Sequence, residues 1–297
     1  MNVLIAIFIG FVLRVALVYS FYGSADATGG ASFYDAIFSN YDVYSIRSPW
    51  PYLPFSNALA WLWGNLAELL NVNVNLAYRL TSVLYDVLIG LVIYQYTKKY
   101  LPNKSSQSLW LYMLNPVTVL IASILSFTDS TTILFLLFCC YFNDYFNGKE
   151  GAVFSAISLA ISISVKPFPF IFIPFFLFRS SNRWLFGTTF SISIFILNSY
   201  YLIGSSVQNI IWLFKYIGKK TLMGSQLGKF GFAPILSEFG SGAEKISILF
   251  SLIGMISIIV LYLIFLRNIK AVEFCFLTFL VTLLFSNHIH PQYIFWM

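Results

Sequence analysis

A small number of charged side chains and imidazoles stand out in this mostly apolar chain as groups that could do chemistry. Residues 23–55 form the first long polar break and hold three aspartates, Asp26, Asp35 and Asp42. A carboxylate acts as a general base when it is ionised and lies beside the hydroxyl group that it deprotonates. Asp26 and Asp35 are the candidate bases, with a structural role as the alternative for each, whereas Asp42 is typical of a turn.

Lys166 is the candidate for binding a phosphate group. It lies between two short apolar segments and directly before Pro167, and a charge at such a position in a membrane is costly and usually functional. Its ammonium group would then pair with a phosphate. The alternative is that the long side chain extends to the membrane interface.

Asp129, His288 and His290 complete the set of candidate binding residues. Asp129 precedes Ser130 and two threonines, which predicts a helix N-cap, and the same carboxylate could also contact a ligand. His288 and His290 lie in a late polar stretch, where an imidazole could bind a phosphate or assist its departure. Two histidines without a CxxC pair give no metal-ligand spacing.

The composition places these residues in a membrane protein. The chain has 297 residues, of which 59% are hydrophobic and only 9% are charged, and its mean hydropathy is +0.81. Soluble domains carry about 25% charged residues, so lipid is the expected solvent for much of this surface. The net charge of +6 therefore indicates basic residues that flank membrane helices, and it does not indicate a nucleic-acid partner.

The apolar segments predict a single all-α domain, residues 1–297, that is polytopic, with about nine membrane helices. Two of these are expected to be half-length and to flank Lys166, because broken backbone at membrane depth is tolerated where it lines a polar cavity. Residues 56–70 are expected to lie on the membrane surface as an amphipathic helix. The predicted spans are 3–21, 74–96, 108–125, 131–146, 152–165, 167–178, 184–203, 246–266 and 271–285.

The distribution of basic residues predicts the orientation. Four short loops hold eight of the 17 basic residues, at 97–107, 147–151, 179–183 and 267–270. The short connections on the opposite side, 126–130 and 286–291, hold none. The basic loops are therefore expected to be cytoplasmic, and 23–55 and 204–245 to be non-cytoplasmic. The same orientation puts all the candidate residues on one face, as a single site requires.

Other polar groups inside the predicted spans have structural interpretations. Arg14, Arg79 and Asp86 lie in the first two spans, where we expect them to form intramembrane pairs. The three cysteines all lie in apolar runs, where a thiol is ordinary packing material. They are Cys139, Cys140 and Cys275.

Four stretches of the chain resemble the multi-helix lipid-linked sugar transferases of the GT-C superfamily. They are SFYDAIFSNYDVYSIRSPWPYLPF, LNPVTVLIASILSFTDSTTI, SVKPFPFIFIP and NHIHPQYIFW. Taken in that order, they are similar to four segments of the family: an acidic first-loop segment, an Asn-Pro helix with an acidic connection, a Lys-x-x-Pro segment and a late His-x-x-Tyr segment. The likeness is greatest to mannosyltransferases similar to the catalytic subunit of GPI mannosyltransferase I and to their prokaryotic relatives, and it extends over nearly the whole chain.

The resemblance implies inverting transfer of a hexose, with mannose as the preferred sugar, from a polyprenyl-phosphate donor to a lipid or glycan acceptor. It implies that Asp26, or alternatively Asp35, is the base, that Lys166 and His290 hold the donor phosphate, and that Asp129 shapes the site. Family members often have two acids one residue apart, whereas Ala-Thr follows Asp26 here. The sequence requires no cofactor, although the superfamily allows a divalent metal.

The resemblance also implies a multi-pass protein in the plasma membrane of a prokaryote or the endoplasmic reticulum of a eukaryote, and it allows a partner membrane subunit. Family members have more helices after the late histidine segment, so C-terminal helices are expected to be missing. One alternative is a non-catalytic membrane subunit of a GPI-transamidase-like complex, which shares the Asn-Pro segment. The other is a transporter, since broken helices also build transport sites, but the sequence shows no inverted repeat.

Overall fold

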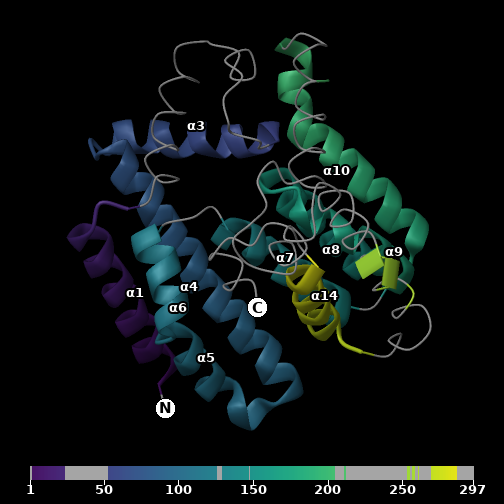
Figure 1. The fold of residues 1–297 in the computed structure, drawn as a ribbon, viewed down its shortest axis with the longest axis horizontal. Helices are drawn as coiled ribbons and strands as arrows, with labels where there is room; N and C mark the ends of the chain where they lie inside the picture. The colour runs from purple at the N-terminus through teal and green to yellow at the C-terminus, as the bar shows by residue number, and fades with distance from the viewer. Residues whose placement is uncertain are drawn as a thin grey trace, which may run out of the picture.

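The computed structural model describes residues 2–23, 53–125, 129–146, 148–204 and 269–285, together with 211, 253–254, 256–257 and 260. The side chains of 200–204 and 281–285 are not described. Within this part of the chain every regular element is a helix, and no strand occurs (Figure 1). The prediction of an all-α fold is therefore confirmed for the described residues.

Two of the described helices are long and apolar enough to cross a membrane, α1 (Val3–Ser20) and α4 (Val74–Tyr100). A third crossing is present if the bent pair of α5 (Ser105–Met113), preceded by a 3-10 turn, and α6 (Pro116–Leu120) counts as one span. Helices of this length and composition support a membrane protein.

The segment that was predicted as one helix over 108–125 is broken, and that prediction was wrong. α6 begins at Pro116 and is bent by 44° from α5, because proline has no N–H group with which to continue the α5 hydrogen bonds. The side chain of Asn115 caps the new helix by accepting a hydrogen bond from Val117 N at 2.9 Å. A π-helical turn, Ile121–Leu125, follows.

α1 and α5 both pack on α4 and form the first helix group with it. Their apolar side chains make a small core of their own, separate from the larger core of the chain. The fully or nearly buried members are Ala6, Val18, Val83, Val87, Leu109 and Met113.

The second helix group is centred on a hairpin of α7 (Asp129–Tyr145) and α8 (Lys149–Val165). The helices are antiparallel because only a short connection separates them, and Gly148 in it has a φ of 88° that favours glycine. α10 (Arg183–Gly204) packs along α8, and α4 packs on α7 and so joins the two groups (Figure 1).

Asp144, near the end of α7, ties several elements together at one end of the hairpin. Its carboxylate accepts hydrogen bonds from Arg179 Nη2 at 2.9 Å, from the backbone N–H of Ala271 at 3.0 Å and from the hydroxyl of Tyr96. Its backbone carbonyl accepts one from Lys99 Nζ at 2.7 Å. The ends of α4 and α7, the end of α9 (Ile173–Arg179) and the start of α14 (Ala271–Phe285) therefore meet here.

The chain returns along the hairpin after Lys166 as a 3-10 segment, η3 (Phe168–Phe172), and α9 (Ile173–Arg179). The break at Lys166-Pro167 is as predicted. Since the chain meets Asp129 at one end of α7 and Asp144 at the other, the segments on both sides of the break run the length of α7. α8 has 17 residues and Phe168–Arg179 is a shorter apolar helix, so neither reaches the length of a full membrane span, as the sequence suggested.

α14 (Ala271–Phe285) packs on the returning segment through stacked aromatic rings and has the predicted bounds. The ring centroids of Phe274 and Phe175 are 3.9 Å apart, and those of Phe279 and Phe168 are 4.8 Å apart. α14 is therefore antiparallel to η3 and α9, and it leads from the Asp144 end of the hairpin towards the Lys166 end.

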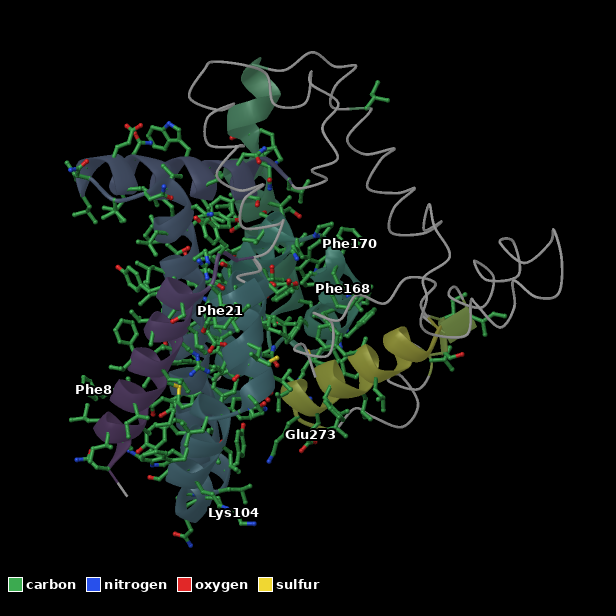
Figure 2. All side chains as sticks on the ribbon, turned by 60° about the vertical axis from the view of Figure 1, so that its left-hand side comes forward. Phe8, Phe21, Lys104, Phe168, Phe170 and Glu273 are labelled. Carbon is green, nitrogen blue, oxygen red and sulfur yellow. The ribbon has the colours of Figure 1, made fainter. Side chains whose placement is uncertain are left out.

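α3 (Pro54–Leu69), which corresponds to the helix expected over 56–70, lies across the end of the bundle opposite Lys104 (Figure 2). It packs on α4, α8 and α10 through small residues. The buried ones are Ser56, Asn57, Ala60, Gly64 and Ala67. Its other face is apolar and exposed, with Trp61, Leu62 and Leu69 at 47%, 50% and 81%.

Candidate functional site

Of the six candidate residues, the described part of the chain contains Asp129 and Lys166. Asp26 and Asp35, and likewise His288 and His290, lie outside the described residues. Their assignments as base and as phosphate ligands stay predictions.

The structure brings Asp129 and Lys166 together as a buried ion pair. The ammonium nitrogen of Lys166 lies 2.9 Å from Oδ1 and 3.0 Å from Oδ2 of Asp129. The aspartate is 0% exposed and the lysine 7% exposed. A single buried charge would be very costly, so each residue requires the other or another polar partner of opposite sign.

The α7–α8 hairpin explains why residues 37 positions apart meet. Asp129 is the first residue of α7, and Lys166 directly follows the last residue of α8, so an antiparallel pair puts them at the same end. Pro167 prevents α8 from continuing, and Lys166 accordingly has extended backbone, with φ −137° and ψ 133°.

A chain of hydrogen bonds links this end of the hairpin to the start of α3. Ser162 Oγ donates to the carbonyl of Thr132 at 2.8 Å and holds α8 against α7. Asn198 Nδ2, on α10, donates to Ser164 Oγ at 2.9 Å, and Asn198 Oδ1 accepts from the backbone N–H of Phe55 at 3.4 Å. The C-terminal boundary of the first polar segment is therefore held near Lys166.

Arg79 holds the other boundary of that segment on the same side of the bundle. Its guanidinium donates to the carbonyl of Phe21, just past α1, and to the carbonyl of Ser123 at 3.0 Å. Ser123 lies in the turn that leads towards Asp129. Both boundaries of the first polar segment thus lie on the side of the bundle that carries the Lys166–Asp129 pair.

A cleft opens next to the ion pair, between α3, α4 and the ends of α7 and α8. The inner part of the cleft has about 30 Å³ of space for water molecules. The wider space between its walls is about 400 Å³ and includes open solvent. No charged side chain of the described residues lines it. The lining residues are Ser56, Leu59, Ala60, Trp63, Tyr78, Thr81, Ser82, Tyr85, Thr131 and Val165.

The sequence contains a further signal for this cleft, in the spacing of polar residues along α4. Tyr78, Thr81, Ser82 and Tyr85 follow the spacing i, i+3, i+4, i+7, which puts polar and aromatic groups on one face of α4. A polar stripe on a membrane-length helix indicates a face turned away from lipid.

The expected intramembrane pairing is confirmed for Arg14 and Asp86, whose Nε and Oδ2 atoms are 2.5 Å apart with both residues 0% exposed. Nη1 of Arg14 also donates to the carbonyl of Met113 at 2.7 Å, and Nη2 donates to Thr118 Oγ1 at 3.1 Å. Arg79 binds carbonyls, as described above. The cysteines are free and buried, as expected.

No protein-family model matches this chain, and no curated protein or solved structure matches it either. What the site can do therefore follows from the chemistry of its own residues. Among the described residues, no group of three or more metal-ligating side chains occurs. The chemical features of the described site are one buried cation, its carboxylate partner and a neutral cleft of aromatic rings and hydroxyl groups.

Proposed function

We propose that this protein is an integral-membrane glycosyltransferase of about nine membrane helices, as the sequence pattern suggests. It transfers a hexose, with mannose as the preferred sugar, from a polyprenyl-phosphate donor to a hydroxyl group of a lipid or glycan acceptor. The observation that carries the proposal is the Lys166–Asp129 pair: a buried cation beside a cleft, at the helix ends where both boundaries of the first polar segment are held.

Lys166 binds the phosphate of the donor in this proposal, and Asp129 holds the ammonium group in position. A charge-assisted contact between ammonium and phosphate is strongest in a water-poor site such as this one. The polyprenyl phosphate is already a good leaving group, so orientation and stabilisation of its negative charge can supply most of the rate acceleration.

Asp26 is the proposed general base, with Asp35 as the alternative. Asp26 follows Gly23, a described residue at the end of α1, by three positions, and three residues of chain reach at most about 11 Å. The proposal therefore keeps Asp26 close to the end of α1, whose following residue Phe21 is held by Arg79. His288 and His290 follow α14, which leads towards the Lys166 end of the hairpin, and they are proposed as further phosphate contacts.

The charges at the opposite end of the bundle support a non-cytoplasmic site. Described basic residues gather around the Asp144 end of the hairpin and the neighbouring helix ends (Figure 2 labels one of them, Lys104). They are Lys98, Lys99, Lys104, Lys149, Arg179, Arg183 and Lys270. Since basic helix ends stay in the cytoplasm, Lys166 and the cleft face the other compartment.

The test is transfer of radiolabelled mannose from polyprenyl-phosphate-mannose to a panel of glycan and glycolipid acceptors by the purified full-length chain. We expect transfer by the native protein, and loss of transfer without loss of expression in either Asp26→Asn or Asp35→Asn. The proposal would be overturned if the protein glycosylated none of the acceptors and also failed to bind the donor. Flux of a solute into proteoliposomes without any sugar product would favour a transporter instead.

A further inference from the structure

The cleft beside Lys166 has walls suited to a sugar ring. Trp63 of α3 and Tyr85 of α4 meet edge to face, with ring centroids 6.2 Å apart and planes at 78°. An aromatic ring offers a flat apolar face on which the C–H groups of a pyranose can stack. Ser56, Thr81 and Thr131 also line the cleft. A hydroxyl group can both donate and accept a hydrogen bond, and that of Thr81 already donates to the carbonyl of Tyr78 at 2.7 Å.

The position of the cleft fixes which part of the donor it can receive. Two lining residues lie beside the ion pair in the sequence: Val165 directly precedes Lys166, and Thr131 is two residues after Asp129. In a sugar phosphate the ring is bonded directly to the phosphate oxygen. A phosphate on Lys166 therefore leaves its sugar within reach of Thr131 and the rings.

We propose that this cleft binds the hexose ring of the donor and selects an uncharged sugar. The proposal rests on the proposed function and deepens it, because it names the class of sugar. An uncharged hexose can exchange its water contacts for the hydroxyl groups of the cleft. A uronic acid or an amino sugar would bring a charge against walls that, among the described residues, hold no opposite charge, and such burial is unfavourable.

The enclosed part of the cleft holds only a few water molecules, and the wider space of about 400 Å³ between its walls includes open solvent. The part that can hold water is about 30 Å³. A ring would therefore sit in the mouth of the cleft, between α3 and α4, and displace water from the inner part.

The test compares two probes on the purified full-length chain in detergent: polyprenyl-phosphate-mannose and polyprenyl phosphate without a sugar. Trp63→Ala should weaken binding of the mannose donor by about tenfold, the order expected for loss of one stacked aromatic ring. It should leave binding of the sugar-free lipid phosphate unchanged. Trp61→Ala is the matched control, since Trp61 lies on the exposed face of the same helix.

Thr131→Val provides a second variant if Trp63→Ala does not fold, because it removes one hydroxyl group and keeps the side-chain volume. We expect a loss of about fivefold in binding of the mannose donor and none for the sugar-free lipid phosphate, in keeping with one lost hydrogen bond. Equal binding of both probes, unchanged in these variants, would overturn the inference while leaving the proposed function standing. Binding of neither probe would overturn both.

Donor selectivity gives an independent readout. Native protein should bind the polyprenyl-phosphate derivatives of mannose and glucose at least about tenfold more tightly than the derivative of glucuronic acid, because none of the described residues that line the cleft carries a positive charge to pair with the carboxylate. A glucuronic acid donor that binds as tightly as the mannose donor would contradict a cleft that selects uncharged sugars.

Discussion

Two buried ion pairs among the described residues carry similar charges, and we propose different roles for them. Arg14 and Asp86 join α1 to α4 inside the first helix group, where the guanidinium also binds the carbonyls of Gly10 and Met113. Lys166 and Asp129 join the ends of α8 and α7 beside the cleft. Both aspartates are 0% exposed, so burial alone does not distinguish the two pairs.

The difference lies in what surrounds the cation. Arginine presents several N–H groups in a fixed plane, and in Arg14 they bind a carboxylate, two carbonyls and the hydroxyl group of Thr118, which supports the broken segment at Pro116. Lysine is a compact point charge on a flexible stem, and Lys166 lies where the helices end and the cleft begins. We therefore propose a structural role for the first pair and a ligand-binding role for the second.

The largest expected effect is loss of stability when the Arg14–Asp86 pair is broken. Asp86→Asn leaves the buried guanidinium without a counter-charge, which costs about 3–5 kcal/mol. Resistance to unfolding by SDS in mixed micelles should fall accordingly. Tyr112→Phe, which removes the hydroxyl group that donates to Asp86 Oδ1 at 2.6 Å, should cost only about 1.5–3 kcal/mol, the usual range for a hydrogen bond to a charged group.

An Asp86→Asn protein that stays as stable as the native one would contradict a structural role for this pair. Where enough folded variant is recovered, its transfer rate per folded molecule should stay close to native. A large loss of transfer rate in properly folded protein would instead bring Arg14 and Asp86 into the site.

The next effect separates stability from activity at the second pair. Lys166→Met alone removes the ammonium group from the buried Asp129 carboxylate and should destabilise the protein by about 3–5 kcal/mol. Adding Asp129→Asn removes that charge, so the double variant should recover much of the stability. Its sugar transfer should still be reduced by about 100-fold, because the phosphate loses a charge-assisted contact of about 1.5–3 kcal/mol.

Stability is measured by thermal unfolding in detergent, and activity by the initial rate of sugar transfer, on the same preparation of each variant. A double variant that recovers stability and activity together would show that Lys166, like Arg14, serves structure alone.

The sequence predicted the helical fold and the break at Lys166 well, because apolar runs and proline act locally. The start of α14 at Ala271 and the end of α8 at Val165 were both predicted. The bend at Pro116 was not predicted, although proline is itself a local signal for it. Arg14 supports the bent backbone through Met113 and Thr118, 99 and 104 residues away, and local sequence does not show such distant partners.

The candidate site was predictable only in part. The sequence indicated that Asp129 and Lys166 share a face of the membrane, but their direct contact depends on the register of the α7–α8 hairpin. The cleft forms because α3 packs across α4. On that side α3 buries small residues, and it exposes Trp61 on its other face. The exposed apolar face agrees with the predicted helix on the membrane surface, whereas the packing of α3 on α4 could not be predicted from composition.

A smaller effect tests the close approach that positions Arg14. Gly10 of α1 lies against α5, and a Cβ atom added there would be 2.6 Å from Met113 Cε and 2.9 Å from its Cβ. Gly10→Ala should therefore cost about 1–3 kcal/mol by overpacking, measured by the same SDS unfolding. Gly187→Ala is the control, since its nearest neighbour would be at an ordinary 3.6 Å and alanine favours a helix. A Gly10→Ala variant as stable as the control would contradict this packing.

The last prediction concerns the packing of α14 on α7 and involves no change in stability. The Sγ atoms of Cys140 and Cys275 are 3.7 Å apart and both residues are buried, so a small movement brings them to the bonding distance of about 2.0 Å. Iodine, which enters apolar regions, should oxidise the two thiols to a disulfide, with release of two protons and reduction of iodine to iodide. A protease site inserted within 205–245 would separate the two cysteines after cleavage.

On a gel, the cleaved fragments should migrate together without reductant and apart with it, and Cys140→Ser should abolish the link. This variant is a matched control because the neighbouring Cys139 stays in place. Fragments that separate in the oxidised native protein would show that α14 does not pack on α7 as described. In that case α14 would not lead towards Lys166, and the proposal that His288 and His290 contact the donor phosphate would lose its support. The Lys166–Asp129 pair does not depend on α14 and would be unaffected.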